Sequence, residues 1–96
     1  MKVYISGQIS DLTEHEYTEN FAQGMREVEA MGHTPCSPVS LPHNHDKRWA
    51  SYMRESLAQL LRCEGIYMLK NYPKSRGANI EHNLARLLDF EIIYQK

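Results

Sequence analysis

The hydrophobic positions of this chain form short apolar runs that alternate with longer segments of helical periodicity. Lys2–Ser6 is rich in Val, Tyr and Ile and stops at Gly7, which predicts a strand followed by a turn. Three further apolar runs predict strands over His33–Ser37, Gly65–Leu69 and Glu91–Tyr94. The chain therefore has four candidate strands, and a long segment separates each from the next.

Each separating segment has the apolar spacing of an amphipathic helix. Before the first helix, Thr13 and Glu16 have the spacing of a capping box, and Gly32 supplies its stop. Gly24 lies inside this helix and indicates close packing on the sheet. Ser56 interrupts the apolar face of the second helix, where it either bonds back to the helix or points into a polar site. The apolar positions are Tyr17, Phe21, Met25 and Val28 in the first helix, Trp49, Tyr52, Met53, Leu57, Leu60 and Leu61 in the second, and Ile80, Leu84, Leu87 and Leu88 in the third.

The alternation of strands and helices predicts a three-layer α/β fold. Right-handed crossovers then give a four-stranded parallel sheet of order 2-1-3-4, with helices on both faces, as in Rossmann-like and flavodoxin-like proteins. Pro35 lacks a backbone donor, so its strand belongs at the sheet edge. Ligands bind such sheets beyond the strand ends where the order reverses, here between the loops Gly7–Asp11 and Asn71–Gly77.

Composition limits the classes of function. The 96 residues suffice for one domain, 1–96, with 42% hydrophobic residues and a net charge of −1. Without a basic run or a long apolar stretch, we expect no nucleic-acid partner and no membrane partner. Cys36 and Cys63 have no motif spacing, so we expect packing thiols in a reduced, cytoplasmic protein. Four strands are few for such a sheet, which favours a homo-oligomer.

Two segments of the sequence invite comparison with known cofactor and metal sites. Gly7-Gln8-Ile9-Ser10 is neither a dinucleotide fingerprint nor a P-loop, so we expect no cofactor. His43-Asn44-His45-Asp46 lacks a third ligand at a standard interval, so a solvated loop is favoured over a metal site, and we expect no metal. The same loop is also a candidate lid.

The stretch Asn71–Asn83 carries the candidate chemistry. Ser75 is placed to cap the third helix, Gly77 lets a ligand approach the backbone, and Glu81 falls on the second turn. Free N–H groups and the helix dipole make this helix start a candidate anion site. Arg76 either pairs with a phosphate or is a solvated residue of the first turn. Glu81 has the alternative of an exposed carboxylate paired with a neighbouring cation.

Several of these motifs resemble the DUF4406 family, which is similar to nucleoside 2-deoxyribosyltransferases and to deoxynucleoside 5′-monophosphate N-glycosidases. The resemblance covers nearly the whole chain and implies their fold. The matching segments are Lys2–Ser10, Asn20-Phe21, Ala30–His33, Trp49 with Tyr52-Met53-Arg54, and Ser75-Arg76-Gly77-Ala78 with Glu81.

The resemblance also implies roles for particular residues. Glu81 matches the nucleophile, and Ser75 and Gly77 match a turn that helps bind the substrate, including phosphate in the monophosphate enzymes. Two positions depart from the pattern. Gln8 stands where most members have Pro, and Ser56 stands where the glycosidases carry an Asp that serves proton transfer.

The candidate reaction is cleavage of an N-glycosidic bond, or deoxyribosyl transfer, on a nucleoside or nucleotide through Glu81. A carboxylate stabilises or traps the oxocarbenium-like state, and the dipole favours its ionised form. A donor to the leaving base is not evident, and the candidates are Glu55, the His43–His45 loop or a second subunit. Tyr4 and Tyr94 are candidates to orient Glu81. The predicted substrate-binding residues are Tyr4, Ser6, Gly7, Gln8, Ser56, Ser75, Arg76 and Gly77.

Two other functions stay open from the sequence. Ser56 in place of the expected acid favours a module that binds a nucleotide in the same crevice without turning it over. A purely structural, homo-oligomeric scaffold is the third hypothesis.

Overall fold

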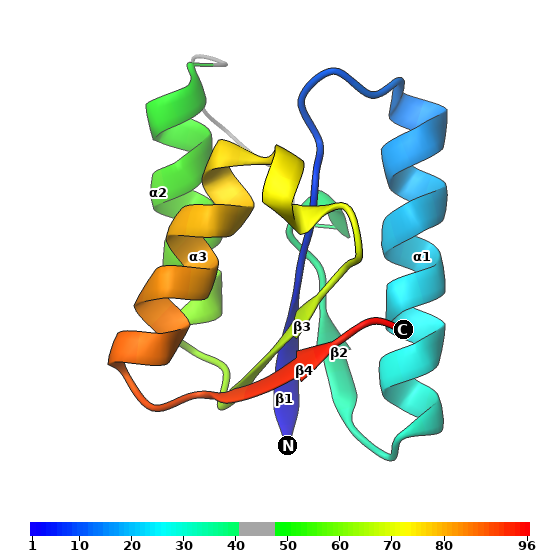
Figure 1. Cartoon of the computed structure of the whole chain (residues 1–96), viewed down its shortest axis with the longest axis vertical. Helices are drawn as coiled ribbons and strands as arrows, with labels where there is room; N and C mark the ends of the chain where they lie inside the picture. Colours follow the sequence, from blue (N-terminus) through cyan, green and yellow to red (C-terminus); the bar gives the residue numbers. More distant parts are fainter. Residues whose placement is uncertain (41–47) are drawn as a thin grey trace.

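A computed structural model describes residues 1–40 and 48–96 and contains four strands, three α-helices and two short 3-10 turns in that part of the chain. The strands and helices alternate along the chain (Figure 1). The elements are β1 (Lys2–Ser6), α1 (Glu14–Ala30), β2 (Thr34–Cys36), η1 (Pro38–Ser40), α2 (Trp49–Leu60), β3 (Gly65–Met68), η2 (Tyr72–Lys74), α3 (Arg76–Leu87) and β4 (Glu91–Tyr94).

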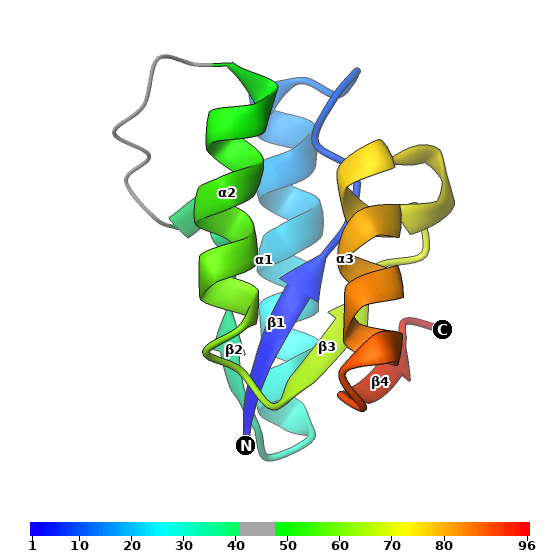
Figure 2. The ribbon, with the colours of Figure 1, turned by 90° about the vertical axis from the view of Figure 1, so that its left-hand side faces the viewer.

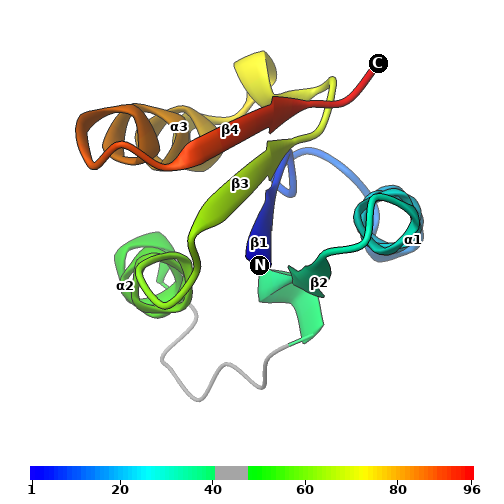
Figure 3. The same cartoon turned by 90° about the horizontal axis from the view of Figure 1, so that it is seen from below.

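The four strands form one parallel sheet of order β2-β1-β3-β4. Figure 3 shows α1 on one face of this sheet and α2 and α3 on the other. The predicted three-layer architecture and strand order are therefore confirmed. Pro35 lies in the edge strand β2, where its missing N–H interrupts no central ladder.

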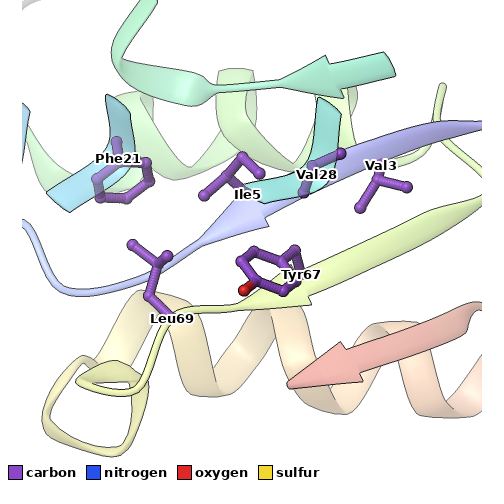
Figure 4. Close-up of a cluster of buried hydrophobic side chains, with 6 residues drawn as sticks. All are labelled: Val3, Ile5, Phe21, Val28, Tyr67 and Leu69. Atoms are coloured by element: carbon purple, nitrogen blue, oxygen red, sulfur yellow. The ribbon is translucent and has the colours of Figure 1, made fainter. Parts of the chain in front are cut away.

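Side chains of the central strands alternate between the two faces of the sheet, as strand geometry requires. Val3 and Ile5 pack toward α1, where they join the cluster shown in Figure 4. Gly24 of α1 approaches this cluster closely, because a Cβ there would lie 2.8 Å from Leu69 Cδ2. Tyr4 points to the opposite face. The alternation thus sends the polar residues of β1 toward α2 and α3.

The cluster on the α2 and α3 face contains both cysteines. Its buried members are Tyr4, Leu60, Cys63, Ile66, Met68 and Ala85, and Cys36 packs against them. Both thiols are free, and burial, followed by the neighbouring Cys36, raises the pKa of Cys63 to about 12. Their packing role agrees with the prediction, although the two thiols are closer neighbours than their spacing suggested.

The apolar stripe predicted for α3 is wrong except at Leu84, which packs against the cluster on the α2 and α3 face. Leu87 is 72% exposed, and Ile80 and Leu88 are exposed as well. The residues that α3 buries are Gly77, Ala78, Glu81 and Ala85. Three of these four are small, so the helix backbone lies close to the sheet, and Ile80, Leu87 and Leu88 are displaced outward. Trp49 and Leu61 were predicted to belong to the apolar face of the second helix, and both are also exposed.

The orientation of α3 in the structure gives a prediction for stability. Leu87→Ala should change the free energy of unfolding by no more than about 0.5 kcal/mol, because the side chain is in water. Ala85→Leu should destabilise by about 1–3 kcal/mol, because Ala85 is fully buried and a larger side chain overpacks its site. Urea denaturation of the two variants measures both values. A larger loss for Leu87→Ala than for Ala85→Leu would contradict the observed helix orientation.

Candidate functional site

The Glu81 side chain is buried under the sheet face that α2 and α3 cover. It is 5% exposed and receives hydrogen bonds from two hydroxyls of β1. The Tyr4 hydroxyl donates to Oε2 at 2.6 Å, and the Ser6 hydroxyl donates to Oε1 at 2.7 Å. Tyr4 and Ser6 are two residues apart on one strand, so both project from the same face. The alternative of an exposed Glu81 paired with a surface cation does not hold.

Burial changes the ionisation of this carboxyl group. Removal from water raises the pKa of Glu81 to about 7, and the hydrogen bonds from Tyr4 and Ser6 oppose only part of that rise. The helix dipole therefore does not keep the group fully ionised, contrary to the expectation from its place on the second turn. Near neutral pH the carboxyl group exchanges between its acid and its ionised form.

Glu81 lies at the wall of a cavity of about 320 Å3. This volume is at the lower end of the range typical for small-molecule sites. Its lining comes from β1 and the loop after it, α1, η1, α2 and α3. The lining residues are Tyr4, Gly7, Ile9, Ser10, Phe21, Pro38, Trp49, Tyr52, Met53, Ser75, Gly77, Ala78 and Glu81.

The start of α3 forms one side of this cavity. Ser75 caps the helix, since its Oγ accepts from the Ala78 N–H at 3.1 Å. A Cβ at Gly77 would lie 2.9 Å from Met53 Sδ, so a side chain there would require Met53 to move. Tyr4, Gly7, Ser75 and Gly77 thus meet Glu81 around one cavity. Ser6 joins them through its hydrogen bond to the carboxylate.

Gln8 and Arg76, two predicted binding residues, do not line the cavity. The Gln8 N–H donates to Asn71 Oδ1 at 3.1 Å, which ties together the two loops predicted to flank the site, and its side chain donates to the Ser10 carbonyl. The Arg76 guanidinium lies over the indole of Trp49, 4.1 Å from the ring centroid. Gln8 therefore connects the loop after β1 to the loop after β3, and Arg76 contacts Trp49, which lines the cavity.

Ser56 is completely buried beside the cavity and does not line it. Burial raises the pKa of Tyr52 to about 12 and that of Tyr4 well above its usual value, while the nearby Ser56 hydroxyl lowers both. The Ser56 Oγ itself makes no hydrogen bond of good geometry with the described residues. The hydroxyls of Tyr4, Tyr52 and Ser56 therefore lie near Glu81, and Ser56 stands at the position for which the resemblance implies an Asp in the glycosidases.

Among the described residues that line the cavity, Glu81 is the sole acidic one. Glu55 is outside the lining, and Tyr94 is 51% exposed with its hydroxyl 2.8 Å from His82 Nε2. Of the two tyrosines expected to orient Glu81, Tyr4 alone contacts it. The His43–His45 candidates lie outside the described residues.

The sequence placed Met53 on a buried helix stripe, and for Trp49 and Tyr52 it favoured a core or subunit-interface position over a base-stacking platform. All three line the cavity. Phe21 was likewise not expected there, whereas Ile9 belongs to the loop Gly7–Asp11 that was predicted to flank the site. The sequence contained one signal for Trp49: α2 begins beyond the carboxyl ends of the strands, so its first turn extends past the sheet.

Among residues 1–40 and 48–96, no group of three potential metal ligands is found. In the same ranges, no helix has the length and apolarity needed to span a membrane.

The fold and the site define a Rossmann-like α/β protein with a buried glutamate at the switch point of its sheet. The chain belongs to the DUF4406 family, a domain of unknown function, whose sequence profile matches residues 1–94. This confirms the resemblance. Comparison with curated proteins finds no match.

Among solved structures, the chain is similar to a 2-deoxyribosyltransferase from Bacillus psychrosaccharolyticus. The two share 14% sequence identity and superpose with a TM-score of 0.73. The match covers 98% of this chain and 71% of the other. At this identity the similarity establishes the shared fold.

The raised pKa of Glu81 gives a prediction for stability against pH. A carboxyl group that binds its proton more tightly when folded stabilises the protein at low pH, and that contribution is lost as pH rises from the unfolded pKa toward about 7. Glu81→Gln, which carries no charge, should therefore be more stable than wild type above neutral pH, by up to about 3 kcal/mol. Urea denaturation at about pH 5 and about pH 8 measures the difference.

Glu19→Gln, at an exposed position of α1, is the matched control and should show no such pH dependence. Equal stability of wild type and Glu81→Gln at both pH values would contradict a buried ionisable group at this position.

Proposed function

We propose that this chain cleaves or transfers the N-glycosidic bond of a nucleoside or nucleotide, with Glu81 as the nucleophile. The observation that carries the proposal is the buried Glu81 carboxylate, held by Tyr4 and Ser6 at the wall of the cavity. The fold shared with a 2-deoxyribosyltransferase supports the same class of reaction. In this proposal the substrate is a small molecule, and residues 1–96 form the one domain that binds it.

The two hydroxyl donors fit a nucleophile whose position must be fixed. In its ionised form Glu81 attacks the anomeric carbon, the carbon–nitrogen bond breaks, and its electron pair leaves with the base. Water or a second base then displaces Glu81 from the sugar. Hydrogen bonds to both carboxylate oxygens fix the geometry of attack.

The first turn of α3 is the proposed binding place for the polar part of the substrate. Ser75 and Gly77 line the cavity at the first turn of α3, where the helix dipole favours an anionic or polar group. Gly7 faces the cavity from the loop after β1. We propose that the sugar, or a phosphate attached to it, binds between these two glycine turns. A donor to the leaving base from a second subunit stays a prediction.

The direct test is release of free base from a panel of 2′-deoxynucleosides and their 5′-monophosphates, followed by chromatography. Glu81→Ala should reduce the rate at least about 100-fold, because it removes the group that traps the sugar. Glu19→Gln, on the exposed face of α1, should keep the wild-type rate. Absence of base release from every substrate by the wild-type protein would reject the proposed activity.

The rate should also depend on pH through Glu81. Because the nucleophile must be ionised, the rate should rise with pH through a midpoint near 7. Tyr4→Phe removes a hydrogen bond that lowers this pKa, so it should move the midpoint upward and reduce the maximal rate. Rates measured against pH for both proteins give the two midpoints. A midpoint that is unchanged in Tyr4→Phe would argue against Glu81 as the titrating group.

The second candidate is a module that binds a nucleotide without turning it over. The observation that favours it is the buried Ser56 beside the cavity, because Glu81 is the one carboxylate among the described residues that line the cavity. In that case nucleotides should raise the melting temperature of wild type, and Glu81→Ala should keep most of the shift. The third hypothesis, a scaffold, predicts neither base release nor a thermal shift.

A further inference from the structure

Trp49 is the tryptophan beside the candidate active-site carboxylate. It opens α2, lines the cavity that contains Glu81, and is 38% exposed. Arg76 opens α3, and its guanidinium lies over the indole, 4.1 Å from the ring centroid. Figure 2 shows α2 and α3 side by side, with both N-terminal ends at the end of the molecule toward which β1 points.

A cation over one indole face restrains the orientation of the ring. Such a contact is worth about 0.5–1 kcal/mol at an exposed site, enough to favour one orientation of an otherwise mobile side chain. The ring is then held in place at the cavity before any ligand arrives. A preorganised aromatic wall binds a flat ligand at a lower entropic cost than a mobile one.

The rest of the lining divides into two chemically different parts. Glu81, Tyr4 and Ser75 bring carboxyl and hydroxyl groups to the cavity. A second set of lining residues offers apolar side chains without charge, namely Ile9, Phe21, Pro38, Trp49 and Met53. A ligand that uses both parts has a polar portion that meets Glu81 and a flat apolar portion that meets the aromatic wall.

We propose that Trp49 is the stacking platform for the purine or pyrimidine ring of the ligand, and that Arg76 is a positioning residue that acts through the indole. This inference rests on the proposed function, because it assigns the base portion of the same substrate. It gives α2 the role of selecting a flat aromatic ring, while β1 and α3 supply the groups that act on the sugar.

The test uses the fact that Trp49 is the sole tryptophan of the chain. Intrinsic fluorescence therefore reports this ring directly and needs no turnover. Titration of the wild-type protein with free adenine, free thymine and 2′-deoxyadenosine should give saturable changes of tryptophan emission. Free 2′-deoxyribose, which has no aromatic ring, should give none.

Variants then separate stacking from general packing. Trp49→Ala should weaken binding of 2′-deoxyadenosine about ten-fold or more, measured by calorimetry, and Trp49→Phe should recover part of the loss. Arg76→Gln should weaken it about two- to five-fold, because the indole loses its restraint. Arg86→Gln, in the last turn of the same helix, is the matched control and should leave binding unchanged.

The outcomes distinguish this inference from the proposed function. Base-dependent emission changes without base release would support stacking and reject catalysis. Base release by wild type together with unchanged emission, or an unchanged KM in Trp49→Ala, would overturn the stacking role and leave the activity standing. No emission change with any base and no base release would overturn both.

Discussion

The buried carboxylate of Glu81 is the constraint on which the rest of the site depends. A charged group in an apolar interior is costly unless hydrogen-bond donors meet it. Tyr4 and Ser6 meet this need from the central strand, one at each carboxylate oxygen. They can do so because they are two residues apart on β1 and share a face of the sheet. Burial still leaves the pKa of Glu81 near 7, so the site holds a carboxyl group that is poised between two states.

The close approach of α3 to the sheet makes this arrangement possible. The helix buries Gly77, Ala78 and Ala85 together with Glu81, and Leu87 and Leu88 at its end are turned outward. Large side chains on that face would lift the helix and separate Glu81 from Tyr4 and Ser6. The apolar area given up by the exposed leucines is thus the cost of bringing a helix carboxylate within hydrogen-bonding distance of a strand.

The cavity forms where several segments of the chain meet at one end of the sheet. Its lining joins the loop after β1, the first turns of α2 and α3, and a phenylalanine from the opposite layer. The hydrogen bond from the Gln8 N–H to Asn71 Oδ1 links the loops that follow β1 and β3. Polar groups gather near Glu81, and apolar and aromatic groups gather near Trp49. A single small cavity therefore presents two kinds of surface.

The sequence alone determined the strand order, because strands that alternate with helices and connect by right-handed crossovers favour it. It also determined the edge position of Pro35 and the capping roles of Thr13 and Ser75, because these follow from the missing N–H of proline and from short-range hydrogen bonds. It also placed Ser75, Gly77 and Glu81 at the sheet's carboxyl end. The tertiary structure alone decided which face of α3 is buried and that Trp49 reaches the cavity. Helical periodicity cannot choose between a stripe of leucines and a stripe of small residues, since the distance between helix and sheet makes that choice.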